Sequence, residues 1–169
     1  MDSSTLRRFV LPVTDRIPTT RRASIKRGLA RVLSCNLTLL AIIFDTDKGP
    51  RKHNYTIQYS RLLDLPRKDP LRILEIGVGG DEHGEGGASL RMWRYRYPNA
   101  RVIGVDLFPK EVDDPKIVIV QGDQGDREFL EALGHREGPF DLVIDDGSHV
   151  GTDIIASFET LFPFVRPRG

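Results

Sequence analysis

The chain has 169 residues, of which 39% are hydrophobic and 29% charged, an ordinary composition for one globular domain. This composition excludes collagen-like, mucin-like and wholly disordered chains. The apolar run at 37–44 is far shorter than the roughly 20 residues of a membrane-spanning helix, so we expect no membrane span. The single cysteine, Cys35, excludes an internal disulfide and a zinc ribbon. It favours a reducing compartment, and we expect a cytoplasmic protein.

The charge is unevenly spread. Residues 1–35 carry a net charge of +6 and the remainder −5. A basic arm suits nucleic acid, a membrane surface or a transit peptide, but Phe9 is its only aromatic residue, and we expect no nucleic-acid partner. The simplest interpretation is a solvated N-terminal extension over 1–35. A helical cap segment over 36–70 and an α/β domain over 71–169 are expected to follow it.

Hydrophobic spacing predicts the elements in chain order. Apolar residues at helical spacing predict one helix over 24–44, a turn at 45–50 and a second helix over 54–63. Strand-like apolar runs then alternate with helical patterns. The strands are expected at 71–78, 101–107, 116–121 and 140–144, and the helices at 88–97, 127–133 and 153–164. This alternation predicts a doubly wound, mostly parallel, Rossmann-like α/β sheet whose ligand lies at the carboxyl ends of the strands.

Glycines and polar residues follow the first three strands. Gly77, Gly79 and Gly80 in the segment LEIGVGG suit a tight turn that lets backbone approach a nucleotide-type ligand, or simply a turn after a core strand. Asp106 suits the two hydroxyls of a ribose, or a helix cap, and Gln124 suits an adenine, or a turn. A nicotinamide-binding turn is the alternative, but it requires a third glycine at position 82 and a helix that starts at once.

The segment FDLVIDDGSHV carries the second set of candidates. Two adjacent carboxylates, Asp145 and Asp146, end a strand and repel each other, so they favour a cation or hydrogen-bond donors. His149 follows three residues later, where it could act as a base at neutral pH. Asp-Gly is also a common turn, and either aspartate could merely cap the next helix.

Together these segments resemble a known family. LRILEIGVGG, GASLRMW, RVIGVDL, GDQGD and DLVIDDGSH, with TDKGPRKHNYTIQY upstream, are similar in order and spacing to the magnesium-dependent, mycinamicin-type sugar O-methyltransferases of macrolide biosynthesis. These are class I methyltransferases that use S-adenosylmethionine (SAM), and the resemblance covers about residues 40–169. It implies SAM and Mg²⁺ as cofactors. It also implies methyl transfer to a hydroxyl of a small-molecule glycoside, in a glycosylated natural product or a glycolipid.

The resemblance also implies roles for particular residues. His149 would be the general base and Asp146 a magnesium ligand, while His53 and Tyr55 would lie in a segment that folds over the cofactor or acceptor. Asp106 would bind the ribose of the cofactor. The other expected cofactor-binding residues are Glu75, Ile76, Gly77, Val78, Gly79 and Gly80 at the methionine end, Ser89 nearby, Gln124 and Gly125 at the adenine, and Asp145.

The chain departs from the family at its C-terminus. In the family, further metal ligands come from the strand after a turn such as the RPRG at 166–169, so the C-terminal strands are expected to be missing. Asp153 and Glu159 are expected on a helix that runs away from the cleft. We therefore expect weak Mg²⁺ binding and little activity from this chain alone. A noncatalytic SAM-binding fragment or interaction module is the alternative, and homo-oligomerisation is left open.

Overall fold

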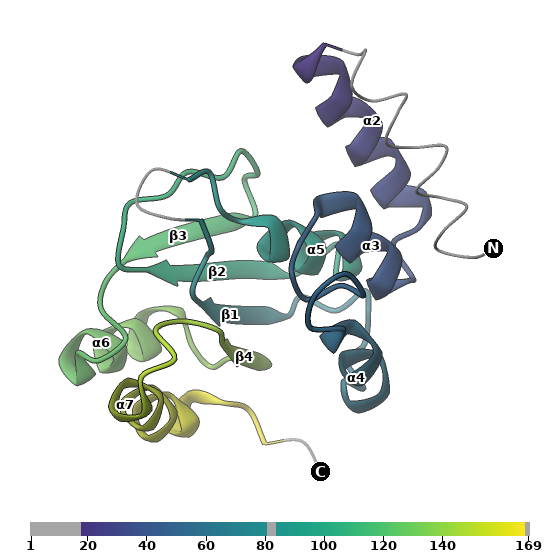
Figure 1. Cartoon of the computed structure of the whole chain (residues 1–169). Coiled ribbons are helices and arrows are strands. Elements are labelled where there is room, and N and C mark those ends of the chain that lie inside the picture. Colours follow the sequence, from purple (N-terminus) through teal and green to yellow (C-terminus); the bar gives the residue numbers. More distant parts are fainter. Residues whose placement is uncertain (1–17, 81–83, 168–169) are drawn as a thin grey trace.

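The computed structural model describes residues 18–80 and 84–167. Its centre is a four-stranded parallel sheet in the order β3-β2-β1-β4 (Figure 1). The strands are β1 (Arg72–Ile76), β2 (Arg101–Asp106), β3 (Ile117–Gln121) and β4 (Leu142–Asp145). Val105 and Asp145 both lie beside Ile76, so the carboxyl ends of three strands meet at one edge of the sheet. The predicted doubly wound, mostly parallel α/β fold is confirmed.

Helices cover both faces of the sheet (Figure 1). One face carries α3 (Leu37–Phe44), α4 (Tyr55–Leu62) and α5 (Ala88–Arg96), and the other carries α6 (Arg127–Glu137) and α7 (Gly151–Leu161), followed by the 3-10 helix η1 (Phe162–Phe164). Ile73 packs into the core between the sheet and α3 and α5. Its neighbour Leu74 packs into the core between the sheet and α6 and α7, because successive strand residues point to opposite faces.

Two helix predictions were wrong in their extent. The single helix expected over 24–44 is divided into α2 (Thr19–Val32) and α3, because the Asn36 side chain accepts a hydrogen bond from Leu39 N and caps a new helix. The helix expected to end at Gly134 continues to Glu137. A Cβ at Gly134 would lie 2.5 Å from Phe164 Cδ2, so this glycine provides room for helix packing and does not end the helix.

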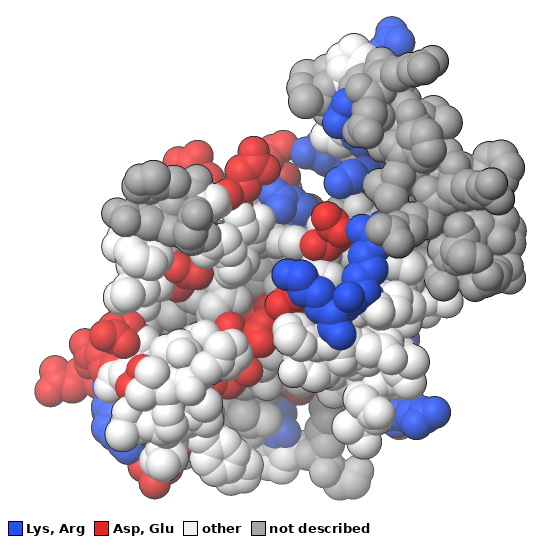
Figure 2. Space-filling model, in the orientation of Figure 1, with Lys and Arg blue, Asp and Glu red and all other residues white. Residues whose placement is uncertain are grey.

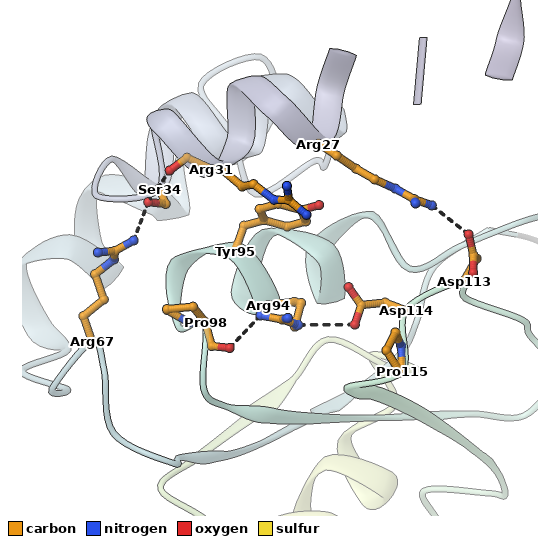
Figure 3. Close-up of a pocket in the computed structure, with 10 residues that line it drawn as sticks. All are labelled: Arg27, Arg31, Ser34, Arg67, Arg94, Tyr95, Pro98, Asp113, Asp114 and Pro115. Atoms are coloured by element: carbon orange, nitrogen blue, oxygen red, sulfur yellow. Dashed lines mark hydrogen bonds and ion pairs between the residues drawn. The ribbon is translucent and has the colours of Figure 1, made fainter. Parts of the chain in front are cut away.

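The described part of the basic N-terminal region forms α2, which docks on an acidic turn. Arg27 on α2 is paired with Asp113 at 2.7 Å, and Arg94 on α5 is paired with Asp114 at 3.2 Å (Figure 3). Arg67 reaches the hydroxyl of Ser34 from the segment before β1 (Figure 3). These side chains line a cavity of about 410 Å³. None of its lining residues lines the two cavities beside the Gly77–Gly80 turn that are described below. No helix among the described residues is long and apolar enough to cross a membrane.

Candidate functional site

The turn after β1 forms the centre of the site. Gly77, Gly79 and Gly80 all have positive φ angles, of 84°, 77° and 77°, a conformation that side chains with a Cβ rarely adopt. At Gly77 the restriction is also steric, because a Cβ there would lie 2.1 Å from the carbonyl oxygen of Asp146. The glycine therefore lets the ends of β1 and β4 come into close contact, a role that the sequence pattern, which indicated only a tight turn, did not show.

Two cavities adjoin at this turn. Both are lined by Gly77, Gly79, Gly80 and Asp146, and their volumes are about 430 and 410 Å³. The larger, which we call the loop cavity, is lined on one side by residues of the segment 45–55 and also includes Ser89 and His149. The other, the strand-end cavity, includes Ile76, Asp106, Gln124 and Asp153. On the face of the molecule shown in Figure 2, acidic and basic side chains lie next to each other around the central hollow.

Asp106 lies at the end of β2, where the sequence indicated it. Its Oδ2 accepts a hydrogen bond from Val78 N at 3.0 Å, and its Oδ1 accepts one from Phe108 N at 3.0 Å. The carboxylate therefore fixes the glycine turn and the start of the next loop while it lines the strand-end cavity. Each oxygen retains acceptor capacity for a further donor, such as a ribose hydroxyl.

Gln124, which is buried and lines the same cavity, is hydrogen-bonded to Asp145, which is exposed. Gln124 Nε2 donates to Asp145 at 3.1 and 3.2 Å, and its Oε1 accepts from Ser148 N at 2.6 Å. Asp145 also accepts from Ser157 Oγ at 2.5 Å. Glu75, Gly125 and Asp145 are not among the described residues that line either cavity, so their direct contact with a cofactor stays a prediction.

Glu75 has no exposed surface, and its carboxylate is surrounded by donors. Ser89 Oγ donates to Oε1 at 2.6 Å and Trp93 Nε1 donates to Oε2 at 2.6 Å. Lys48 Nζ lies 2.9 Å from Oε1. Burial raises the pKa of Glu75 above its usual value, and the bonds from Lys48, Ser89 and Trp93 act in the opposite direction.

Lys48 connects Glu75 to the aspartate that was predicted to bind magnesium. The ammonium lies 2.5 Å from Asp146 Oδ2, and the lysine side chain is only 2% exposed. Burial lowers the pKa of Lys48, but the two carboxylates outweigh it and raise that pKa above its ordinary value. The Lys48 side chain is therefore charged at neutral pH.

Asp146 and His149 both line the loop cavity, as the DDGSH pattern suggested. His149 is exposed and has a positive φ of 59°, which turns its side chain back toward this opening. His53 and Tyr55 line the same cavity, with their rings stacked at a centroid distance of 5.2 Å. The arrangement can hold a hydroxyl-bearing ligand near an imidazole.

A complete magnesium site is not formed by the residues that the structure describes. Among residues 18–80 and 84–167, no three His, Cys, Asp or Glu side chains come together as metal ligands. The Asp145 oxygens are bonded to Gln124 and Ser157, and one Asp146 oxygen is bonded to Lys48. Asp146 thus offers one oxygen to a cation, and Mg²⁺ normally takes six ligands in an octahedron.

Two residues of the site were missed from the sequence. Lys48 was noted only as a letter of the TDKG segment, and its burial between two carboxylates has no local signal. Asp153 was expected to point away from the cleft. It lines the strand-end cavity and accepts a hydrogen bond from Ser148 Oγ at 2.8 Å, because α7 begins close to the turn after β4.

Comparisons with known proteins agree with this geometry. The chain is 46% identical over 136 residues to mycinamicin VI 2''-O-methyltransferase from Micromonospora griseorubida, covering 79% of this chain and 34% of that protein. It is 44% identical over 126 residues to demethylmacrocin O-methyltransferase from Streptomyces fradiae, covering 73% of this chain and 32% of that protein. No family model matches the chain.

A solved structure matches the same share of the chain. This is the MycE methyltransferase from the mycinamicin pathway, in complex with Mg, SAH and mycinamicin VI. The TM-score is 0.76 at 46% identity, and the match covers 79% of this chain and 35% of that one. The chain thus spans about a third of the length of the relatives it matches. Over that shared part, the chain is a homologue of the mycinamicin-type sugar O-methyltransferases.

Proposed function

We propose that this chain forms the SAM-binding part of an O-methyltransferase that methylates a hydroxyl of a glycoside. The observation that supports this most strongly is the pair of cavities that adjoin at the Gly77–Gly80 turn, one lined by Asp106 and Gln124 and the other by Asp146 and His149. A bound SAM would supply an electrophilic methyl group on its sulfonium. Its adenosine half would occupy the strand-end cavity, and the methyl group would then face the loop cavity.

The residues of the loop cavity suit the acceptor. His149 would take the proton of the acceptor hydroxyl, whose oxygen forms the new bond to the methyl carbon as the bond from sulfur to that carbon breaks. The products are a methyl ether, S-adenosylhomocysteine and a protonated His149. The chain would contribute mainly by aligning the hydroxyl with the methyl group and excluding water. The relatives are named as O-methyltransferases of mycinamicin VI, of demethylmacrocin and of an α-L-rhamnosyl tetracenomycin C, and we propose a glycoside acceptor.

The proposal includes magnesium, with Asp146 as its ligand in this chain. The MycE structures contain Mg, and an ion held near two acceptor oxygens lowers the pKa of a hydroxyl. Asp146 is the ligand that the described residues offer, together with one or both acceptor oxygens. Further ligands would have to come from outside the described residues.

The first test is cofactor binding. Isothermal titration with S-adenosylhomocysteine should give saturable one-to-one binding, whereas NAD⁺ at the same concentrations should give none. The sequence disfavours NAD⁺, because position 82 holds a glutamate where the nicotinamide-binding turn requires its third glycine. Binding of NAD⁺ with no binding of S-adenosylhomocysteine would overturn the proposal.

The second test separates an enzyme from a noncatalytic SAM-binding module. The incomplete magnesium site favours the module for the chain as it stands. Methyl transfer from labelled SAM to macrolide glycosides is measured with Mg²⁺ and with EDTA. Magnesium-dependent product assigns turnover to this chain. Tight S-adenosylhomocysteine binding without any product would support the module instead.

A further inference from the structure

The ammonium of Lys48 lies between two carboxylates that come from distant parts of the chain. Its Nζ is 2.9 Å from Glu75 Oε1 at the end of β1 and 2.5 Å from Asp146 Oδ2 just after β4. These are ordinary contacts between an ammonium and a carboxylate, about 0.4–0.9 Å longer than the roughly 2.0–2.1 Å at which Mg²⁺ holds an oxygen, so the two oxygens would have to move inward to hold such an ion. The two oxygens are therefore arranged around one cation, and the cation is a side chain of the protein.

The loop that carries Lys48 holds it firmly. Thr46 Oγ1 accepts a hydrogen bond from Lys48 N at 3.4 Å, and Lys48 O accepts one from Thr56 N at 3.1 Å. Gly49 follows, with the Ala41 Cβ 3.1 Å from where its own Cβ would lie. The backbone on both sides of Lys48 is thus fixed against α3 and α4, and the ammonium is directed to the strand ends.

The charges of Glu75 and Asp146 explain why a cation is needed between them. Glu75 has no exposed surface, and a buried carboxylate without a positive partner is costly. Ser89 and Trp93 donate hydrogen bonds to Glu75 but bring no charge. One lysine against two carboxylates leaves one negative charge, which faces the loop cavity at Asp146.

We propose that Lys48 is the resident cation of this site: it occupies the position between Glu75 and Asp146 that a divalent ion would otherwise take, and so keeps the divalent-ion affinity of the chain low. The inference concerns the same site as the proposed function but does not require methyl transfer. It makes Lys48 a positioning residue, because the ammonium fixes the Asp146 carboxylate and leaves only its other oxygen for a metal.

The test is metal binding without cofactor or acceptor. Mn²⁺ is titrated into the wild-type chain and into Lys48→Ala, with free Mn²⁺ followed by electron paramagnetic resonance. Removing a positive charge a few ångströms from a divalent ion, and opening space for it, should tighten binding roughly tenfold or more. Mn²⁺ should also raise the melting temperature of Lys48→Ala more than that of the wild type.

Matched variants identify the cause. Lys52→Ala removes a charge from the same loop and the same cavity, at an exposed position, and should leave Mn²⁺ affinity near that of the wild type. Asp146→Asn in the Lys48→Ala background should abolish the gain. If folded Lys48→Ala binds Mn²⁺ no more tightly than the wild type, or if Lys52→Ala gains equally, the proposal is wrong.

The test also gives an answer if the Lys48→Ala variant does not fold. Lys48→Gln retains hydrogen-bond donors for Glu75 while it removes the charge, so it should bind Mn²⁺ more tightly than the wild type even if Lys48→Ala is unstable. If both variants stay unfolded at saturating Mn²⁺, a metal cannot replace the ammonium, and Lys48 is only a structural counter-ion. S-adenosylhomocysteine binding is measured separately, so failure of this inference and failure of the proposed function are distinguishable.

Discussion

Gly77 faces the backbone of Asp146 so closely that a Cβ on Gly77 would lie 2.1 Å from the Asp146 carbonyl oxygen. Gly77 N also donates to Val105 O at 2.8 Å, and Asp146 N donates to Ile76 O at 2.9 Å. The glycine turn and the DDGSH segment are thus packed together by their main chains. A shift of the backbone in one of these segments therefore displaces the other directly, through main-chain contacts.

Gly77→Ala should destabilise the fold strongly. The added methyl group must displace the β4 turn as well as adopt a left-handed conformation, so we expect a loss of about 3 kcal/mol or more in the free energy of unfolding. Gly79→Ala is the matched control, because its φ of 77° is similar but nothing lies within 4 Å of its Cβ. It should lose only about 1–2 kcal/mol. Equal urea midpoints for the two variants would contradict the steric argument.

Asp106→Ala should weaken S-adenosylhomocysteine binding. Loss of a charge-assisted bond to the ribose corresponds to about 1.5–3 kcal/mol in binding free energy, measured by calorimetry. Because Asp106 also holds Val78 N and Phe108 N, Asp106→Asn is needed as a second variant that retains one acceptor oxygen. Asp64→Asn, at an exposed position outside both cavities, is the control. Unchanged affinity in both Asp106 variants would reject the ribose role.

His149→Asn should remove the proposed base while leaving the backbone intact, since asparagine tolerates the left-handed conformation that His149 adopts. With an accepted glycoside, the rate should fall by about 10²–10⁴, the usual contribution of a general base. S-adenosylhomocysteine affinity should change little. His135→Asn, at an exposed position on α6 outside both cavities, is the control. A full rate in His149→Asn would leave this histidine without a role in proton transfer.

Glu137 gives a pH-dependent prediction. Burial alone would raise its pKa, but the hydrogen bonds and charge of Arg101, at 3.1 and 3.4 Å, together with those of Arg136, at 3.4 Å, outweigh burial and lower it from 4.5. Because the pKa is lower in the folded state, the stabilisation is present above the unfolded-state pKa. It is lost as the pH falls through the folded-state value.

Glu137→Gln should therefore be less stable than the wild type by about 1 kcal/mol at pH 7, with the difference shrinking as the pH falls below 4.5. Denaturant unfolding at a series of pH values measures it. Glu131→Gln, exposed on the same helix with only a 3.9 Å contact to His135, should show no such trend. A difference that stays constant down to pH 3 would contradict the assignment.

The strands and the glycine turn could be predicted from the sequence because their signals are local. LRILEIGVGG is an apolar run bounded by glycines, and β1 occupies Arg72–Ile76 within it. The end of β4 at Asp145 also followed from a run of apolar residues that stops at two aspartates. Parallel pairing then brings such ends together, which is why most of the predicted site residues line the two cavities.

The remaining features depend on contacts that periodicity does not encode. Gly134 was expected to end a helix, yet it lies within α6 because Phe164 packs on it. Lys48 follows a turn and carries no hydrophobic pattern, while its partner Asp146 is 98 residues away. Asn36 differs from Gly134 and Lys48, because the signal was local: asparagine is a common helix cap. It lay within the single helix expected over 24–44, and apolar spacing alone does not show the break between α2 and α3.

That separation of 98 residues has a consequence for how the protein assembles. The Lys48–Asp146 ion pair closes a loop that includes all four strands, so it forms only after the sheet has brought β1 and β4 side by side. During synthesis, the helices α3 and α4 leave the ribosome long before Asp146 does. The loop between them can be fastened over the strand ends by this ion pair only once the turn after β4 has been made.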